Sequence, residues 1–363
     1  MKDRVKNIFK NTEYKPDIIL IRNSSEPYID NNFFYTTGLD KGLFEGSIAV
    51  LFPDGNIDLI VPELESEIAK KADANIKVYK NLNEYNIILK ESISNSKNIG
   101  INFHSISYSD FYNLNKKFSN LKFFDVSVSF EKSRLIKDEI EIKLIKKACN
   151  IADKVVERIP EILHEDITEY ELAAEIDYLM QKSGADKAAF ETISSFGKNT
   201  SQPHYTHGST KLNINDFVLC DFGACFKKYN SDITRTFIFG KASKMQKDMY
   251  KTILDAQNLG FEKTKSGVKA IDVHKVVDSF INSTKFKGRF IHSTGHSLGL
   301  SVHDSDARLS QYSDLILKEN MVFTIEPGIY LPEIGGIRIE DDVLIKKDGI
   351  EILTKSSKKL IEI

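Results

Sequence analysis

The sequence has few of the features that direct a protein to a membrane, to nucleic acid or to secretion. No apolar run approaches the length of a transmembrane helix. The formal net charge is only −2, which gives no reason to expect binding to nucleic acid or to an anionic membrane surface. The charged segment 1–15 lacks the apolar stretch of a secretory signal. We therefore expect neither nucleic acid nor a membrane among the partners.

Cysteines are scarce, and motifs for nucleotides are missing. Cys149, Cys220 and Cys225 form no Cys-x-x-Cys pair and are odd in number, which predicts buried thiols in a reducing, cytoplasmic setting. The first 134 residues contain neither a GxGxxG fingerprint nor a phosphate-binding loop. A nucleotide site is therefore not expected there.

The composition indicates a globular protein with two domains. The chain has 363 residues, of which 41% are hydrophobic and 28% charged. Residues 1–134 alternate strand-like and helical segments, which predicts an α/β domain with Phe33, Phe34 and Tyr35 in its core. A strong turn signal, Pro53-Asp54-Gly55-Asn56, joins two of the strands. The expected strands are 17–21, 47–52, 57–61, 97–103 and 123–128, with a short helix over 64–71.

Residues 135–363 have a different pattern, in which amphipathic helices are separated and followed by strands rich in Phe, Val and Ile. This pattern predicts an α+β domain. Thr168 and Glu171 form a capping box that begins one of its helices. The other expected helices are 138–158, 246–263 and 270–282.

A predicted hairpin in the second domain carries two acidic residues in apolar sequence. Asp221 lies in the first strand, and Asp232 lies in the returning strand after a connection, 226–230, of hairpin length. The two carboxylates can therefore lie side by side.

The stretch 321–345 is expected to form two apolar strands broken by Pro-Gly and Gly-Gly pairs. Glu326 ends the first strand. Around the second break, Arg338 and Glu340 alternate with isoleucines, so both are expected on one face of the strand. Such a face is either solvated or gathered around a ligand.

His296, in Ser-Thr-Gly-His, completes a set of four carboxylates and one imidazole in apolar or glycine-rich sequence. Taken singly, each residue has an ordinary structural explanation. If the carboxylates converge, each pair at ~4 Å repels by about 4 kcal/mol at an effective dielectric near 20. Such a cluster needs cations, and two divalent ions would balance it. Oxygen ligands with one histidine suit Mn²⁺, Co²⁺, Zn²⁺ or Fe²⁺. A water shared by two ions would yield a hydroxide near neutral pH.

Other histidines supply proton donors to this predicted centre. His204 and His303 could stabilise the oxyanion or protonate the leaving amine. His292 precedes His296 by four residues, but the intervening glycine and threonine argue against a helix, and there is no HExxH motif of a mononuclear zinc protease. We interpret His292 and the remaining histidines, namely His104, His164, His207 and His274, as ordinary structural residues.

Nearly the whole chain resembles the metallopeptidase family of prolidases (Xaa-Pro dipeptidases) and aminopeptidase P. The first domain, 1–134, is similar to the creatinase-type N-terminal domain through Asn32–Gly38 and the Pro-Asp-Gly hairpin. The second, 135–363, resembles the pita-bread catalytic fold, a curved antiparallel sheet flanked by helices. Its matching motifs are Asp-Phe-Gly, Ser-Asp-Ile-Thr-Arg-Thr, Thr-Gly-His-Ser-Leu-Gly-Leu, Ile-Glu-Pro-Gly-Ile-Tyr and Ile-Arg-Ile-Glu-Asp-Asp.

The resemblance implies a role for each motif residue. The metal ligands it implies are Asp221, Asp232, His296, Glu326 and Glu340, with Asp232 and Glu340 bridging both ions. It further implies that His204 contacts substrate, that His303 lies near the scissile carbonyl, and that Arg338 can engage the substrate carboxylate or a ligand. Ser297 and Asp304 stand where the family often has glycine and glutamate.

The hypothesis that follows is a dinuclear metallo-exopeptidase, most simply a Xaa-Pro dipeptidase, with Mn²⁺ or Co²⁺ favoured and Zn²⁺ or Fe²⁺ left open. An aminopeptidase P acting on longer proline-containing peptides is the alternative, and a catalytically silent peptide-binding protein is an alternative of another class. The N-terminal domain and the sequence around His204 disfavour a methionine aminopeptidase, and the complete ligand set disfavours a metal-free creatinase-like enzyme. The resemblance also implies a homodimer.

Overall fold

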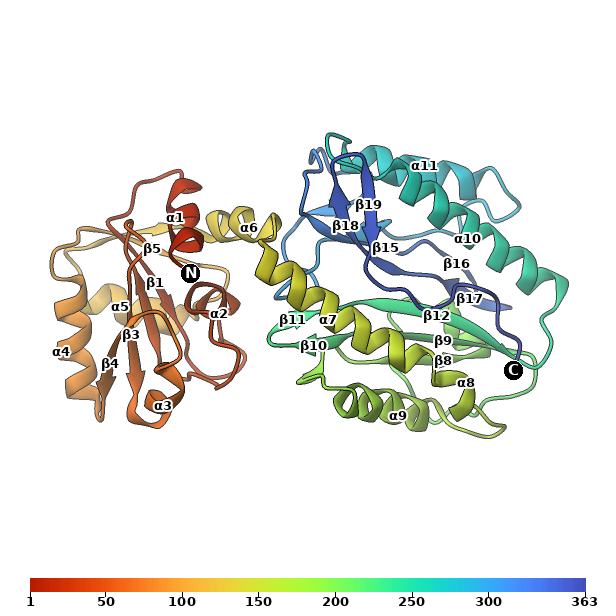
Figure 1. Cartoon of the computed structure of the whole chain (residues 1–363), viewed down its shortest axis with the longest axis horizontal. Coiled ribbons are helices and arrows are strands. Elements are labelled where there is room, and N and C mark those ends of the chain that lie inside the picture. The colour runs from red at the N-terminus through yellow and green to blue at the C-terminus, as the bar shows by residue number, and fades with distance from the viewer. The chain divides into compact units, whose positions relative to one another are not determined.

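The computed structural model describes all 363 residues, which form two compact units, Met1–Arg134 and Leu135–Ile363. Figure 1 labels most of the helices and strands of both units. None of the helices is both long and apolar enough to cross a membrane.

The first unit is built on a six-stranded mixed sheet in the order β4-β3-β2-β1-β5-β6. Antiparallel pairing joins β1 to β2 and β2 to β3, and the other neighbours are parallel. Gly55, with φ +93°, forms the predicted turn between β2 and β3. The strands are β1 (Ile18–Arg22), β2 (Ile48–Leu51), β3 (Ile57–Pro62), β4 (Asn75–Tyr79), β5 (Asn98–Ile101) and β6 (Lys122–Asp125).

Helices complete this α/β unit, as predicted. The aromatic residues of α2, including Phe33 and Tyr35, are buried in its core. Two predicted boundaries were wrong. The strand expected over 123–128 ends at Asp125, whose carboxylate accepts the Ser127 N–H as a helix begins. The segment 64–71, expected to be one short helix, forms only a 3₁₀ turn and one helical turn. The helices are α1 (Lys2–Lys10), α2 (Asn31–Thr37), η1 (Glu63–Glu65), α3 (Ser66–Ala69), α4 (Leu82–Ile93), α5 (Tyr108–Lys117) and α6 (Ser127–Leu135).

Three helices of the second unit begin at capping boxes. The capping box of Thr168 and Glu171 is present as predicted, and Asp138 with Glu141 and Ser243 with Gln246 form two more. The helices are α7 (Glu139–Val156), α8 (Ile159–Ile162), α9 (Glu169–Lys182), η2 (Gly197–Ser201), α10 (Lys244–Lys263) and α11 (Ala270–Asn282).

Antiparallel sheets lie between two layers of helices in this unit (Figure 1). One apolar cluster joins α7 and α9 to β8, β9 and β12, and a second joins α10 and α11 to β16 and β17. The sheets have the orders β12-β9-β8, β15-β18-β19, β11-β10-β7, β16-β17 and β13-β14. The strands are β7 (Lys187–Ala188), β8 (Ile193–Phe196), β9 (Asp216–Phe222), β10 (Ala224–Phe226), β11 (Tyr229–Asn230), β12 (Ile233–Phe239), β13 (Gly295–His296), β14 (Arg308–Leu309), β15 (Val322–Ile325), β16 (Gly328–Leu331), β17 (Gly335–Arg338), β18 (Asp341–Lys346) and β19 (Gly349–Ile352).

The stretch 321–345 contains four strands rather than the two expected. The chain leaves one sheet at Glu326 and Pro327, forms the β16–β17 hairpin, and returns to β18 after Glu340. Glu326 and Glu340 therefore lie between strands rather than within them, so the alternation of side chains along a strand does not determine where they point.

Candidate metal centre

One cavity of about 710 Å³ in the second unit brings together all the side chains that the sequence predicted as metal ligands or catalytic residues. Its wall includes the four carboxylates, three histidines and one arginine of the predicted site. These residues are Asp221, Asp232, His296, Glu326, Glu340, His204, His303 and Arg338.

The β9–β12 pair places the two aspartates at this cavity, but they are not direct partners across the ladder. Asp221 lies opposite Thr234, and Asp232 precedes the first residue of β12. The backbone segments around Gly223 and Ser231 approach each other closely. Glycine is needed for this, because a Cβ at position 223 would lie 1.9 Å from the Ser231 carbonyl oxygen. A side chain at position 223 would therefore displace the backbone next to Asp232.

A second close approach places His296 beside Glu326. A Cβ on Gly295 would lie 1.9 Å from the carbonyl oxygen of Thr324, so glycine is required where β13 passes β15. His296 Nε2 lies 3.5 Å from Glu326 Oε1 and 3.5 Å from Asp232 Oδ2. The imidazole thus lies between two of the carboxylates.

Arg338 and Thr234 hold the remaining carboxylates. The Arg338 guanidinium is 3% exposed, and its Nη2 donates to Asp221 Oδ2 at 2.5 Å. Its other nitrogens donate to the Tyr330 hydroxyl at 2.9 Å and to Thr234 Oγ1 at 3.0 Å. The Thr234 hydroxyl in turn donates to Glu340 Oε2 at 2.6 Å. Because all three nitrogens of Arg338 have partners, this residue orients the carboxylate wall of the cavity.

Burial and mutual repulsion oppose ionisation of these carboxylates. Burial raises the pKa of Asp232 and Glu340 well above their ordinary values, and the neighbouring carboxylates raise both further. Burial also raises the pKa of Glu326 to about 7, although Arg338 opposes this shift. The pKa of His296 falls to about 3, mainly through burial, which keeps its imidazole neutral and able to bind a metal.

The side chains fit a divalent metal ion. Ligand atoms of Asp232, His296 and Glu340 all lie within 4.8 Å of one another. Oδ1 of Asp221 and Oδ1 of Asp232 are buried and accept no hydrogen bond from the chain. A buried carboxylate oxygen without a donor is costly, and a cation would satisfy it. The mixed oxygen and imidazole donors suit first-row divalent ions.

Two of the predicted histidines line the same cavity. His303 packs edge-on against His296, with ring centroids 4.3 Å apart. Its pKa is lowered by partial desolvation within the cavity and by Arg308 and His204, so its imidazole is neutral at neutral pH. His204 lies in an exposed loop of the cavity wall.

From the sequence, His292 was interpreted as an ordinary structural residue, but the structure places it at the site. It lines the cavity, and its Nε2 lies 2.8 Å from the Tyr330 hydroxyl. Burial and the charge of Arg338 lower its pKa to about 3. The segment around it is not helical, as predicted. Its position four residues before His296, in the same loop, was the only available signal.

The two departures from the family motifs lie outside the cavity wall. Ser297 is fully buried, and its hydroxyl lies 2.9 Å from that of Ser305. Asp304 is buried too, and its carboxylate accepts the Ser301 N–H and lies 3.4 Å from Lys137 Nζ. Their effect on the cavity is therefore exerted through the backbone of the loop that carries His296 and His303.

Known proteins share both units of this architecture. Residues 143–347 match the model of metallopeptidase family M24, and residues 12–136 match the creatinase/prolidase N-terminal domain. A Xaa-Pro dipeptidase of Pyrococcus horikoshii is 40% identical over 91% of this chain and 92% of its own length. The crystal structure of the prolidase from the same organism has a TM-score of 0.89 at 37% identity, covering 99% of this chain and 100% of that one.

A related exopeptidase has an equally similar structure. The X-Pro aminopeptidase of Thermotoga maritima has a TM-score of 0.90 at 31% identity, covering 96% of this chain and 98% of that one. The predicted pita-bread fold with its creatinase-type N-terminal domain is confirmed. The chain therefore belongs to metallopeptidase family M24, a family of divalent-metal-dependent peptidases.

Proposed function

We propose that this protein is a metallo-exopeptidase that hydrolyses Xaa-Pro peptide bonds, most simply those of Xaa-Pro dipeptides. The observation that carries the proposal is the convergence of four carboxylates and a neutral imidazole on one cavity. The names of the relatives, a Xaa-Pro dipeptidase and a prolidase, supply the substrate class.

In this proposal, the five convergent residues hold two divalent ions, with Mn²⁺ or Co²⁺ favoured and Zn²⁺ or Fe²⁺ open. The ligands are Asp221, Asp232, His296, Glu326 and Glu340. When bound, the ions polarise the peptide carbonyl and lower the pKa of the attacking water.

The remaining cavity residues serve binding and proton transfer. His303 presents a neutral imidazole, whose N–H can donate to the carbonyl oxygen as negative charge develops there. The proline nitrogen leaves as a secondary amine and needs a proton, for which His204 lines the accessible side of the cavity. Phe190, Ile193 and Val302 give part of the wall an apolar surface for the substrate side chain.

Arg308 is the cation that we assign to the carboxylate of a dipeptide substrate. It lines the cavity and is exposed, and its guanidinium makes no hydrogen bond or ion pair with the chain. Arg338, by contrast, already donates from all three nitrogens. Arg308 is also close enough to His303 to lower the pKa of that residue.

Replacing Arg308 with methionine is expected to raise KM for a Xaa-Pro dipeptide about 10-fold. This corresponds to the lower end of the free-energy range for a hydrogen bond to a charged group. A Xaa-Pro-Yaa tripeptide carries its carboxylate one residue further on, so its KM should change much less. Steady-state kinetics on both substrates check this. Equal losses on the two peptides would exclude a role in recognising the dipeptide carboxylate.

The experiment that tests the function compares a Xaa-Pro dipeptide, a Xaa-Pro-Yaa tripeptide and a Xaa-Ala dipeptide. We expect hydrolysis of the first to exceed that of the third, to stop on chelation and to return with Mn²⁺ or Co²⁺. Full activity in the chelated protein would contradict the metal-dependent mechanism. Faster cleavage of the tripeptide would favour an aminopeptidase, the function named for the Thermotoga maritima structure.

Two further parts of the proposal concern the setting of the enzyme. All three cysteines are buried and unpaired, as predicted, which supports a reducing, cytoplasmic location. The homodimer implied by the family resemblance is also proposed, and its native mass would be twice that of the 41.2 kDa chain. A catalytically silent peptide-binding protein is disfavoured because none of the five candidate ligands is missing.

A further inference from the structure

A buried ion pair lies behind the candidate metal centre and is not part of the cavity wall. Arg235 of β12 is 1% exposed, and its Nη2 lies 2.7 Å from Oδ1 of the fully buried Asp341. Moving both charges out of water carries a penalty that their attraction often fails to recover. The ion pair alone is therefore expected to contribute little to the stability of the fold. The other contacts of Arg235 and Asp341 must account for its presence.

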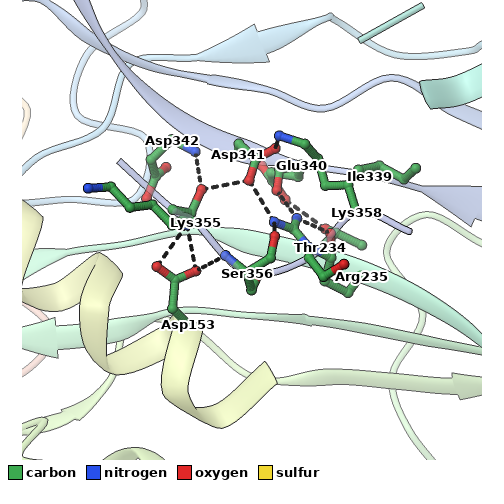
Figure 2. Close-up of polar contacts among 12 residues, drawn as sticks. Asp153, Thr234, Arg235, Ile339, Glu340, Asp341, Asp342, Lys355, Ser356 and Lys358 are labelled. Atoms are coloured by element: carbon green, nitrogen blue, oxygen red, sulfur yellow. Dashed lines mark hydrogen bonds and ion pairs between the residues drawn. The ribbon is translucent and has the colours of Figure 1, made fainter. Parts of the chain in front are cut away.

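The Arg235 guanidinium fixes the main chain around Glu340. Its Nη1 donates to the carbonyl oxygen of Glu340 at 2.6 Å and to that of Thr234 at 3.0 Å (Figure 2). Thr234 is also the residue whose hydroxyl binds the Glu340 carboxylate. One buried arginine thus holds both the backbone of Glu340 and the partner that orients its side chain.

The neighbouring carboxylate, Asp342, fixes the main chain of Asp232 in the same way. The Asp232 N–H donates to Asp342 Oδ2 at 2.9 Å. Asp341 and Asp342, at the start of β18, therefore each support one of the two candidate ligands grouped with His296. Asp341 supports Glu340 through Arg235, and Asp342 supports Asp232 directly.

The C-terminal strap, which we define as residues 354–358, ties these aspartates together. Thr354 Oγ1 donates to Asp341 Oδ1 at 2.8 Å and accepts the Asp342 N–H at 3.1 Å. Lys358 Nζ donates to Asp341 Oδ2 at 2.9 Å, and the Ser356 carbonyl accepts from Arg235 at 3.1 Å. Figure 2 shows Arg235, Ser356 and Lys358 around Asp341.

The strap is itself anchored to the helical layer. Both carboxylate oxygens of Asp153, on α7, accept the Lys355 N–H at 2.8 Å, and one of them also accepts the Ser356 N–H at 2.8 Å (Figure 2). A continuous set of contacts therefore runs from α7 through the strap and the buried ion pair to Asp232 and Glu340.

We propose that Arg235, Asp341 and the C-terminal strap form a positioning element that sets the affinity of the centre for its divalent ions. The proposal rests on the metal-dependent function proposed above. Groups that orient metal ligands from behind typically change metal affinity by about 10–100-fold when they are removed. The strap is thus a functional part of the metal centre although it lies outside the cavity.

The test compares Lys358→Met with a matched control, Lys251→Met. Each change removes one lysine that pairs with an aspartate in the second unit, at 2.9 Å to Asp341 and at 2.6 Å to Asp255. Only the first pair belongs to the positioning element. Titration of the metal-free proteins with Mn²⁺ should show about 10-fold weaker binding for Lys358→Met and wild-type binding for Lys251→Met. Hydrolysis by Lys358→Met should recover as the Mn²⁺ concentration rises.

Arg235→Lys extends the test to the buried pair. It keeps the charge but loses the planar fork that reaches several oxygens at once, so we expect binding up to about 100-fold weaker. If this variant does not fold, the partly exposed Lys358 still decides the question.

The two proposals fail in different ways. Wild-type Mn²⁺ affinity in Lys358→Met, even with a lowered Tm, would show a purely structural role and overturn the positioning proposal. A wild-type protein that neither binds Mn²⁺ nor cleaves a Xaa-Pro dipeptide would instead overturn the proposed function.

Discussion

Replacing Glu340 with glutamine is expected to reduce hydrolysis of a Xaa-Pro dipeptide by at least about 100-fold, because even groups that only orient metal ligands cost 10–100-fold when lost. The substitution preserves the size of the side chain, and its amide oxygen can still accept the Thr234 hydroxyl that now binds Glu340 Oε2 at 2.6 Å. It removes the negative charge and one of the two oxygens available to cations. Steady-state kinetics at saturating Mn²⁺, with Mn²⁺ titration of the metal-free protein, measure the loss.

Glu351→Gln is the matched control, since it makes the same chemical change on β19 of the same unit, outside the cavity. We expect this control to keep wild-type kinetics. The metal-free Glu340→Gln protein should be no less stable than the metal-free wild type, because the change relieves repulsion among buried carboxylates. A lower melting temperature without metal would mean that Glu340 is needed for folding rather than for binding ions.

The long helices of the second unit and the candidate site residues were within reach of the sequence because their signals are local. The capping box of Thr168 and Glu171 is a short-range pattern, and the structure has it as predicted. Carboxylates in apolar sequence, such as Asp221 and Glu340, are conspicuous because burial of a charge demands a partner. Their roles as metal ligands are a proposal that the variants above test.

The positions of the strand breaks could not be predicted from the sequence, because contacts with residues far away in the chain determine them. Glu340 follows the end of β17, where its N–H donates to the Thr234 carbonyl at 3.2 Å. Alternation of apolar residues through 337–340 gives no sign of this partner, which lies about a hundred residues earlier in the chain. The same holds for Asp232, whose place before β12 follows from the close approach at Gly223.

Residues that act on the candidate site through other residues could not be predicted from the sequence either. His292 depends on the Tyr330 hydroxyl, and Arg235 depends on carbonyl oxygens of distant strands. A histidine in a loop or an arginine in a strand has many ordinary explanations, and only the folded arrangement distinguishes them. The arginine in Asp-Ile-Thr-Arg-Thr was part of a matched motif, yet its position behind the centre could not be derived from spacing.

His303→Ala is expected to lower kcat for a Xaa-Pro dipeptide by about 10²–10⁴-fold, the usual contribution of a positioned proton donor or acceptor. Its neutral imidazole lies edge-on to His296, in the cavity that holds the reacting carbonyl in our proposal. KM should change much less than kcat, because the interaction strengthens only as charge develops on the carbonyl oxygen. His303→Gln keeps an N–H donor and should restore part of the rate.

His164→Ala is the control, as a surface histidine of the same unit that lies outside the cavity. Mn²⁺ affinity should remain at the wild-type value in His303→Ala, which separates this role from that of the candidate ligand His296. A kcat close to wild type would move the assignment to His204, the other predicted histidine on the cavity wall. A loss of Mn²⁺ affinity equal to the loss of rate would instead place His303 among the residues that hold the ions.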